Sequence, residues 1–316
     1  MIEVKNLVKR YGNHLALDNV SFTIQKGEVV GFLGPNGAGK STTMNIITGY
    51  LSSTEGDVLV DGVSVLEQPE KAKQKIGYLP ELPPLYTDMT VNEYLSFVCD
   101  LKGVPAKQKE ETLARVTKQA RISDVRKRLI RNLSKGYKQR VGIAQALVGD
   151  PEVLILDEPT VGLDPKQITE VRDLIKNLSE EHTLIISSHI LAEVQAVCDR
   201  VIIINKGRIV ATDTPDNLAK SAIKSNKLEM RIKGPKNDVL NGIAQIPGVA
   251  YAEIVRIREE GAVDVNVEMA DEADAREAIF EFCSSNHYPI LLMKTAEVNL
   301  EDIFLQITGE REARRG

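Results

Sequence analysis

A glycine-rich stretch near the start of the chain has the residue types needed to hold a phosphate group. In order, its residues are Gly34, Pro35, Asn36, Gly37, Ala38, Gly39, Lys40 and Ser41. Glycines let consecutive backbone amides turn toward one anion, and a helix that starts here adds partial positive charge. Lys40 can reach the outer phosphates of a nucleotide, and Ser41 can offer its hydroxyl to Mg²⁺. The stretch therefore predicts a nucleotide site, to which we add the next residue, Thr42. A glycine-rich turn without function would have to match every position by chance.

Two acids at the end of a second apolar run could complete such a site. Residues 153–156 are continuously apolar, and Asp157 and Glu158 follow them. Ligands of open α/β sheets bind at the carboxyl ends of the strands, where these acids would lie. We expect Asp157 to hold Mg²⁺ and Glu158 to act as the general base toward the attacking water. Apolar strands that end in Asp-Glu are common on their own, so this prediction depends on the phosphate loop.

The elements that must position these residues alternate between strands and helices up to about residue 214. The strand candidates share a continuously apolar sequence and are residues 29–33, 153–156, 184–186 and 201–204. Such runs are typical of strands covered on both faces. The clearest helix start is Asp164-Pro165, a capping acid followed by proline at the first helical position. This order predicts an α/β fold with a largely parallel sheet.

The segment from about 84 to 134 interrupts the alternation and is mainly helical in pattern. Thr90 with Glu93 forms a capping box. The amphipathic run that follows consists of Val91, Tyr94, Leu95, Val98 and Leu101. We predict a helical subdomain inserted into a nucleotide-binding domain of residues 1–220.

A second, small α+β domain is predicted over residues 224–316. Its expected strands lie at about 228–232, 249–257, 263–269 and 290–293, and its helices at about 239–243, 273–282 and 300–307. The order βαββαβ suggests a ferredoxin-like fold. Strands that alternate charged and apolar residues favour a packing or dimer-stabilising module. A small-molecule sensor is the alternative, although the domain has no glycine-rich loop.

A third motif connects these regions to a known family. Leu133-Ser134-Lys135-Gly136-Tyr137 lies between the helical segment and the acid pair. It resembles the signature loop of ABC ATPases, usually written LSGGQ, and departs from it at Lys135 and Tyr137. Together with the other two motifs, it makes the first 215 or so residues similar to ABC transporter nucleotide-binding domains, and it disfavours a P-loop kinase.

The resemblance assigns roles to residues that would otherwise be read as structural. Tyr11 matches the aromatic residue that stacks on adenine, and His189 matches the histidine that contacts the γ-phosphate. Asp164 belongs to the loop that crosses the dimer interface. Ser134 and Gly136 match the residues that touch ATP held by the opposite subunit. As isolated residues, Tyr11 and His189 would more often belong to the core.

The hinge before the helical segment departs from the family pattern. Family members usually carry glutamine after the strand at 76–79, whereas here Pro80 is followed by Glu81. A carboxylate can still bind Mg²⁺, and more strongly, but it brings another negative charge near the phosphates.

The hinge, the signature loop and the extra C-terminal domain are similar to those of ABC-2 type exporter ATPases, a group with antibiotic-resistance, sodium-efflux and gliding-motility members. The resemblance implies ATP hydrolysis in a head-to-tail pair, with a second copy or a paralogous subunit. It also implies a separate polytopic membrane subunit, for which Leu85, Tyr86 and Met89 are docking candidates. Packing within the helical subdomain is the alternative role of these three residues. The transported substrate would be set by the membrane subunit.

Composition restricts the remaining classes. No run approaches the roughly 20 apolar residues of a membrane span, and the start lacks a secretory signal, so we expect a cytoplasmic protein bound to the inner face of the membrane. A net charge of −5 disfavours nucleic acid as a partner. Cys99, Cys198 and Cys283 have no metal-type spacing and should be buried thiols. The main rival, a soluble ABC ATPase of translation or DNA repair, usually has two nucleotide domains or a long coiled-coil insertion.

Overall fold

The computed structural model describes residues 1–218, 227–256, 261–270 and 273–295. They form two compact units, and the boundary between the units falls between Pro215 and Asp216. Within the described residues, no helix is both long enough and apolar enough to cross a bilayer. The three cysteines are free and buried, as predicted.

The larger unit is built on a six-stranded sheet with the order β10-β9-β3-β8-β7-β6. Its strands are β3 Val29–Leu33, β6 Ile76–Leu79, β7 Val153–Asp157, β8 Thr183–Ser188, β9 Arg200–Asn205 and β10 Arg208–Asp213. All neighbouring strands run parallel except β10, which pairs antiparallel with β9 at the edge. Every residue of β3, β7 and β8 is buried, which explains the apolar runs at 29–33, 153–156 and 184–186 within them. The predicted parallel sheet is confirmed.

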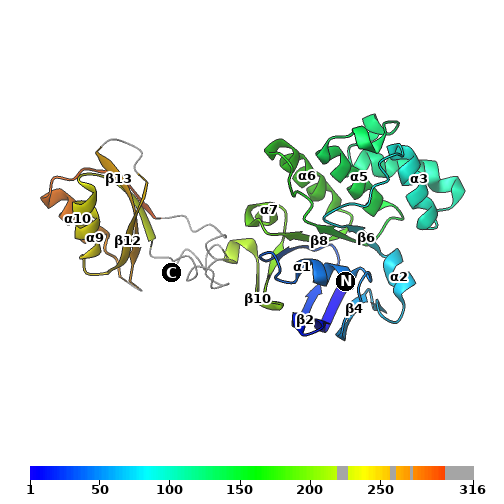
Figure 1. The fold of residues 1–316 in the computed structure, drawn as a ribbon, viewed down its shortest axis with the longest axis horizontal. Coiled ribbons are helices and arrows are strands. Elements are labelled where there is room, and N and C mark those ends of the chain that lie inside the picture. The colour runs from blue at the N-terminus through cyan, green and yellow to red at the C-terminus, as the bar shows by residue number, and fades with distance from the viewer. Residues whose placement is uncertain (219–226, 257–260, 271–272, 296–316) are drawn as a thin grey trace. The chain divides into compact units, whose positions relative to one another are not determined.

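A second, antiparallel sheet was not predicted. It has the order β2-β1-β4-β5 and consists of β1 Ile2–Tyr11, β2 His14–Ile24, β4 Glu55–Val60 and β5 Val63–Ser64. Its buried residues share one core with Val30 and Phe32 of β3 and with Met44 of the helix α1, Lys40–Ile47. Accordingly, α1 lies between the two sheets (Figure 1). The β1–β2 hairpin ends where Tyr11 pairs with His14, and this register places Tyr11 near the phosphate loop.

Helices cover the other side of the six-stranded sheet (Figure 1). The helix α6, Pro165–Leu178, begins as predicted, because Asp164 accepts a hydrogen bond of 2.9 Å from the Gln167 amide. The short helix α7, Leu191–Gln195, packs closely on β3. A Cβ at Gly31 would lie 1.9 Å from the Val194 side chain, so only glycine permits this approach. The helix α2, Pro69–Gln74, precedes β6.

The helical segment contains α3 Val91–Leu101 and α4 Lys109–Gln119, with short 3-10 turns at η1 Ala106–Gln108, η2 Ser123–Val125 and η3 Ile130–Asn132. The helix α5, Lys135–Leu147, directly follows it. The capping box of Thr90 and Glu93 is confirmed. The prediction for Leu101 was wrong, because Leu101 is 70% exposed and Cys99 completes the buried stripe instead. Leu101 also has helical spacing, three residues after Val98, but it is the last residue of α3, where the buried stripe has already ended.

The smaller unit follows the predicted order of elements. It consists of β11 Lys227–Lys233, α9 Lys236–Ala244, β12 Val249–Arg256, β13 Ala262–Met269, α10 Arg276–Ser285 and β14 Ile290–Thr295. The strands form an antiparallel sheet with the order β12-β13-β11-β14, and α9 and α10 cover one face (Figure 1). Leu228, Met230 and Ile232 pack beneath them. α10 begins at Arg276 and not at the predicted residue 273. The predicted final helix at 300–307 lies outside the described residues.

Candidate nucleotide site

The phosphate loop connects β3 to α1 and has the backbone that the glycines predict. Gly37 and Gly39 adopt left-handed φ angles of 79° and 111°, which favour glycine. The Lys40 side chain is only 6% exposed and turns back into the loop. Its Nζ donates hydrogen bonds of 2.8 Å to the Gly34 carbonyl and 3.3 Å to the Pro35 carbonyl. The ammonium group therefore lies inside the loop, where it could reach a bound phosphate.

The general-base candidate Glu158 is held between two other predicted residues. Its Oε1 lies 3.5 Å from Lys40 Nζ, and its Oε2 lies 2.8 Å from His189 Nδ1. Glu158 has a left-handed φ of 49°, which is unfavourable for a residue with a side chain. Its amide donates to the Ser187 carbonyl at 3.2 Å and to Ser187 Oγ at 3.0 Å, and these bonds hold that conformation. The structure thus brings Lys40, Glu158 and His189 together from three separate elements.

Asp157 has the environment of a cation ligand. Burial raises the pKa of this carboxyl, hydrogen bonding with Ser187 and Ser41 lowers it, and the charges of Glu158 and Glu81 raise it, so the net pKa lies above its ordinary value. A buried carboxylate near other acids is costly unless a cation compensates it. Ser41 and Asp157 offer the oxygen ligands that hard divalent cations prefer.

The chain alone does not complete such a cation site. Within the described residues, no group of three or more His, Cys, Asp or Glu side chains could hold a metal ion. A cation here would take its other ligands from nucleotide phosphates and water, as Mg²⁺ commonly does.

A cavity of about 550 Å³ adjoins the loop and collects most of the predicted nucleotide residues. Those predicted residues are Tyr11, Pro35, Asn36, Gly37, Gly39, Lys40, Ser41, Thr42, Glu81, Glu158 and His189. Tyr11 is 48% exposed, so its ring is available for a base to stack on. Gly34 and Ala38 shape the loop without lining the cavity, and a Cβ at Gly34 would lie 2.5 Å from the Ile204 carbonyl oxygen.

Sequence reasoning missed His14, Ala16 and Val161, which also line this cavity. His14 pairs with Tyr11 across the end of the β1–β2 hairpin. The Gly12-Asn13 turn between them was the signal that could have identified it.

The signature loop forms a different surface. Ser134 caps α5 by accepting a hydrogen bond of 3.4 Å from the Tyr137 amide. Gly136 packs against the first turn of α6, where a Cβ would lie 2.8 Å from Gln167. Ser134 and Asp164 line a cavity of about 520 Å³ whose described lining includes no residue of the nucleotide cavity. Within one chain, Ser134, Gly136 and Asp164 are therefore not brought together with Lys40.

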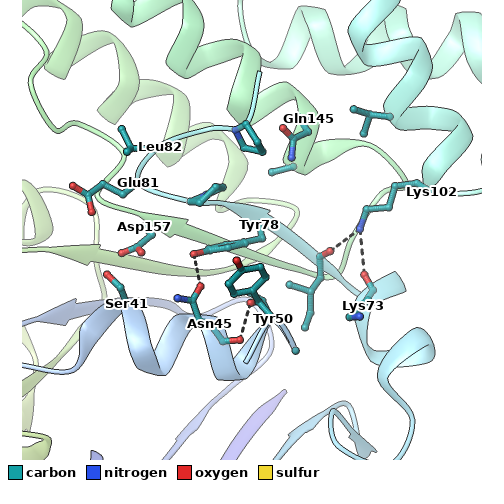
Figure 2. Close-up of a pocket in the computed structure, with 17 residues that line it drawn as sticks. Ser41, Asn45, Tyr50, Lys73, Tyr78, Glu81, Leu82, Lys102, Gln145 and Asp157 are labelled. Atoms are coloured by element: carbon teal, nitrogen blue, oxygen red, sulfur yellow. Dashed lines mark hydrogen bonds between the residues drawn. The ribbon is translucent and has the colours of Figure 1, made fainter. Parts of the chain in front are cut away.

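The hinge residue Glu81 connects the nucleotide cavity to a third one. That cavity, of about 870 Å³, is lined by residues of α1, β6, α3 and α5. Glu81, Asp157 and Ser41 lie at one end of it, and Lys102 with Lys73 lies at the other (Figure 2). Glu81 is exposed and lines both cavities.

Comparison with known proteins agrees with this geometry. The ABC transporter family model matches residues 17–161. The linearmycin resistance ATP-binding protein LnrL of Bacillus subtilis is 32% identical over 98% of both chains. The lantibiotic transport ATP-binding protein SrtF of Streptococcus pyogenes is 41% identical over 66% of this chain and 89% of its own.

Solved structures give the same result for the larger unit. The structure of an ATP-binding subunit of an ABC transporter has a TM-score of 0.63, is 32% identical, and covers 70% of this chain and 92% of its own. A dimeric ATP-binding cassette in a post-hydrolysis state, bound to ADP and Pi, has a TM-score of 0.62, is 28% identical, and covers 68% of this chain and 98% of its own. The fold and the site define a P-loop protein that binds and hydrolyses a nucleotide. The chain belongs to the ABC transporter ATP-binding family and is an ATPase of that family.

Proposed function

We propose that this chain powers an ABC-2 type membrane exporter by ATP-driven closure of a head-to-tail pair. The observation that carries the proposal is the separation of Lys40 and Ser134 into two different cavities of one chain. Ser134 and Gly136 of the signature loop, together with Asp164 of the interface loop, can then complete a nucleotide site only on a second subunit. That subunit is a second copy or a paralogue.

The residues of one chain divide the chemistry among themselves. Ser41 and Asp157, with Glu81 beside them, would hold Mg²⁺, which when bound neutralises charge on the phosphates. Lys40 exchanges its loop carbonyls for the outer phosphates, and Tyr11 offers its ring to adenine. Glu158 accepts the proton of the attacking water, and His189 orients the carboxylate.

Mixing two inactive chains tests the shared site. Ser134→Arg blocks the signature loop, and Lys40→Ala removes the phosphate-binding ammonium, so each homodimer should fail to hydrolyse ATP. A mixed dimer keeps one site with neither lesion, and ATPase activity should partly return. Folded mutants that form mixed dimers without recovering activity would contradict the shared site.

We propose that the membrane subunit docks in the cavity of Figure 2 and its extension. The extension is an adjoining cavity of about 500 Å³. It shares five lining residues with the cavity of Figure 2, namely Lys73, Pro84, Val98, Lys102 and Gln145. Exposed apolar side chains border the two cavities, namely Tyr50, Leu82, Tyr86 and Leu101. Of the three docking candidates from the sequence, Tyr86 lines this groove, whereas Leu85 and Met89 are half-buried and do not. Relatives named as linearmycin resistance and lantibiotic transport ATP-binding proteins support an export function.

Co-purification from detergent separates export from the rival function. A polytopic membrane protein in the pull-down supports export, whereas ribosomes or DNA would support a role in translation or repair. The double variant Leu82→Glu/Tyr86→Glu should no longer co-purify with the membrane partner. Val210→Glu is the matched control, because Val210 is an exposed apolar residue on β10, at the opposite edge of the sheet from β6.

We further propose the domain division 1–220 and 224–316, with the helical subdomain at about 84–134. The strand order β12-β13-β11-β14 with two helices on one face supports a ferredoxin-like fold for the second domain. A cytoplasmic location on the inner face of the membrane follows from docking on a membrane subunit. Nucleic acid has no place in this function.

A further inference from the structure

A single carboxylate joins the two loops that carry Glu158 and His189. Glu193, in α7, accepts a hydrogen bond of 2.5 Å from Thr160 Oγ1 and one of 3.1 Å from Ser188 Oγ, both at Oε2. Thr160 follows Glu158 closely in the loop after β7, and Ser188 directly precedes His189 at the end of β8. Both hydroxyls are buried, so neither has water as a ready substitute partner.

Other hydrogen bonds join the same two loops. Ser187 Oγ donates to Asp157, and the Glu158 amide donates to Ser187 Oγ, which joins the loops at the strand ends. The Glu158–His189 contact of 2.8 Å and the two bonds to Glu193 join the same loops. The functional contact is therefore one of several bonds that hold these two loops together.

The packing of α7 on β3 fixes the position of the Glu193 carboxylate relative to the phosphate loop. Val194, next to Glu193, is fully buried and occupies the space at Gly31 that a Cβ would fill. Gly31 belongs to β3, the strand that leads into the phosphate loop. Since α7 rests on β3, Glu193 is held from the same strand that positions Lys40.

We propose that Glu193 is a positioning residue for ATP hydrolysis. Its carboxylate accepts hydrogen bonds from the Thr160 and Ser188 hydroxyls and so holds Glu158 against His189. We call these two hydrogen bonds the clasp. The inference rests on the proposed general-base role of Glu158. A local role is the alternative, because Ser188 Oγ also accepts from the Ile190 amide at 3.0 Å in the turn before α7. Thr160 takes no part in that turn, so a change at Thr160 separates the two roles.

Thr160→Val tests the clasp because it removes the hydroxyl and keeps the shape of the side chain. A misplacement of about 1 Å can cost on the order of 100-fold in rate, so we expect kcat to fall roughly tenfold to 100-fold. The ATP dissociation constant should not change, whereas the melting temperature should fall slightly because the Glu193 carboxylate loses one hydrogen bond. Thr160→Ser should retain activity. Glu193→Ala should lower kcat as much as Thr160→Val does. Glu193→Gln should lose less activity, because its amide oxygen can still accept the hydrogen bonds. The Thr160→Val/Glu193→Ala double variant should have the same kcat as Glu193→Ala.

The matched control is Thr169→Val, because the Thr169 hydroxyl donates to the Pro165 carbonyl on the exposed face of α6. It should behave as the parent protein. The proposal would be wrong if Thr160→Val kept the kcat of the parent. It would also be wrong if the losses of kcat in the two single variants multiplied in the double variant. Glu158→Gln, measured in parallel, separates the two failures: if it also retains hydrolysis, the general-base assignment fails, and if it alone loses hydrolysis, only the clasp fails.

Discussion

At the scale of single residues, the proposed general base Glu158 is held by three other residues of the nucleotide site. Lys40 and His189 contact the two oxygens of Glu158, and Ser187 fixes its backbone. In the proposed mechanism Lys40 exchanges its contact with Glu158 for a phosphate, while His189 keeps its own. We therefore expect ATP binding and hydrolysis to depend on different contacts of the same carboxylate.

Glu158→Gln separates these two functions. The amide keeps the size of the side chain but cannot accept a proton, so hydrolysis should fall by about 10²–10⁴ while ATP binding persists. The variant should also accumulate as an ATP-bound dimer, detected by sizing in ATP. Nearly unchanged turnover with no dimer would contradict the assignment.

Glu81 should make nucleotide binding more dependent on the metal ion. Its charge raises the pKa of Asp157, and it lines the nucleotide cavity, so it opposes the charge of free ATP. Glu81→Gln should raise the Mg²⁺ concentration for half-maximal hydrolysis by roughly threefold to tenfold, a modest electrostatic effect at a partly exposed site. ATP binding in EDTA should become tighter in the same variant.

Mg²⁺ titration of hydrolysis and equilibrium ATP binding in EDTA measure the two effects. Glu70→Gln is the control, because Glu70 lines only the far extension of the groove. If both quantities are the same in Glu81→Gln and the parent, Glu81 has no role at the cation.

At the scale of elements, an ion pair joins the starts of β3 and β9. Arg200 donates to both oxygens of Glu28, at 2.6 and 3.0 Å, and the Gln25 amide adds a bond of 2.8 Å. Burial alone would raise the pKa of Glu28, but these hydrogen bonds and the Arg200 charge hold it below its ordinary value. A lowered pKa means that the ionised carboxylate stabilises the fold, and that this contribution is lost as the pH falls through the folded pKa.

Glu28→Gln should therefore lower the free energy of unfolding at pH 7 by about 1–3 kcal/mol. The difference from the parent should shrink at about pH 3, because the parent carboxyl gains its proton as the pH falls from the ordinary Glu value of about 4.3 through the lower pKa of the folded state. Urea unfolding at both pH values measures it. Glu70→Gln should change little, because its pair with Lys73 is largely exposed. An equal loss at both pH values would assign the effect to packing instead of charge.

The elements show why some of the fold could be read from the sequence and some could not. β3 and the first four residues of β7 are apolar because both faces are covered, and local composition is enough to identify them. β1 and β4 pair over about 50 residues of sequence, and only their register brings them into one sheet. The site divides similarly: the loop at 34–41 is local in sequence, whereas the Thr160–Glu193 bond depends on how α7 packs at Gly31.

At the scale of the whole molecule, the smaller unit has a core of its own. Leu228, Met230 and Ile232 of β11 pack with residues of α9 and α10. The core described above for the larger unit consists of residues from 2 to 204. The relative SrtF aligns over only 211 residues, whereas LnrL aligns over 310, so relatives of both extents exist. We infer that the larger unit folds without the smaller one.

Ending the chain near Ser225 tests this inference and the role of the C-terminal domain. The truncated chain should remain folded and bind ATP through Lys40, since every residue that lines the nucleotide cavity lies before residue 190. If the domain is a packing module, dimer dissociation in ATP should become faster or the membrane partner should be lost from pull-downs. Both are measured against the full chain, with Lys40→Ala as the control for ATP-dependent pairing. If both are unchanged while the full chain, and not the truncated one, binds a metabolite saturably, the domain is a sensor and the packing role is wrong.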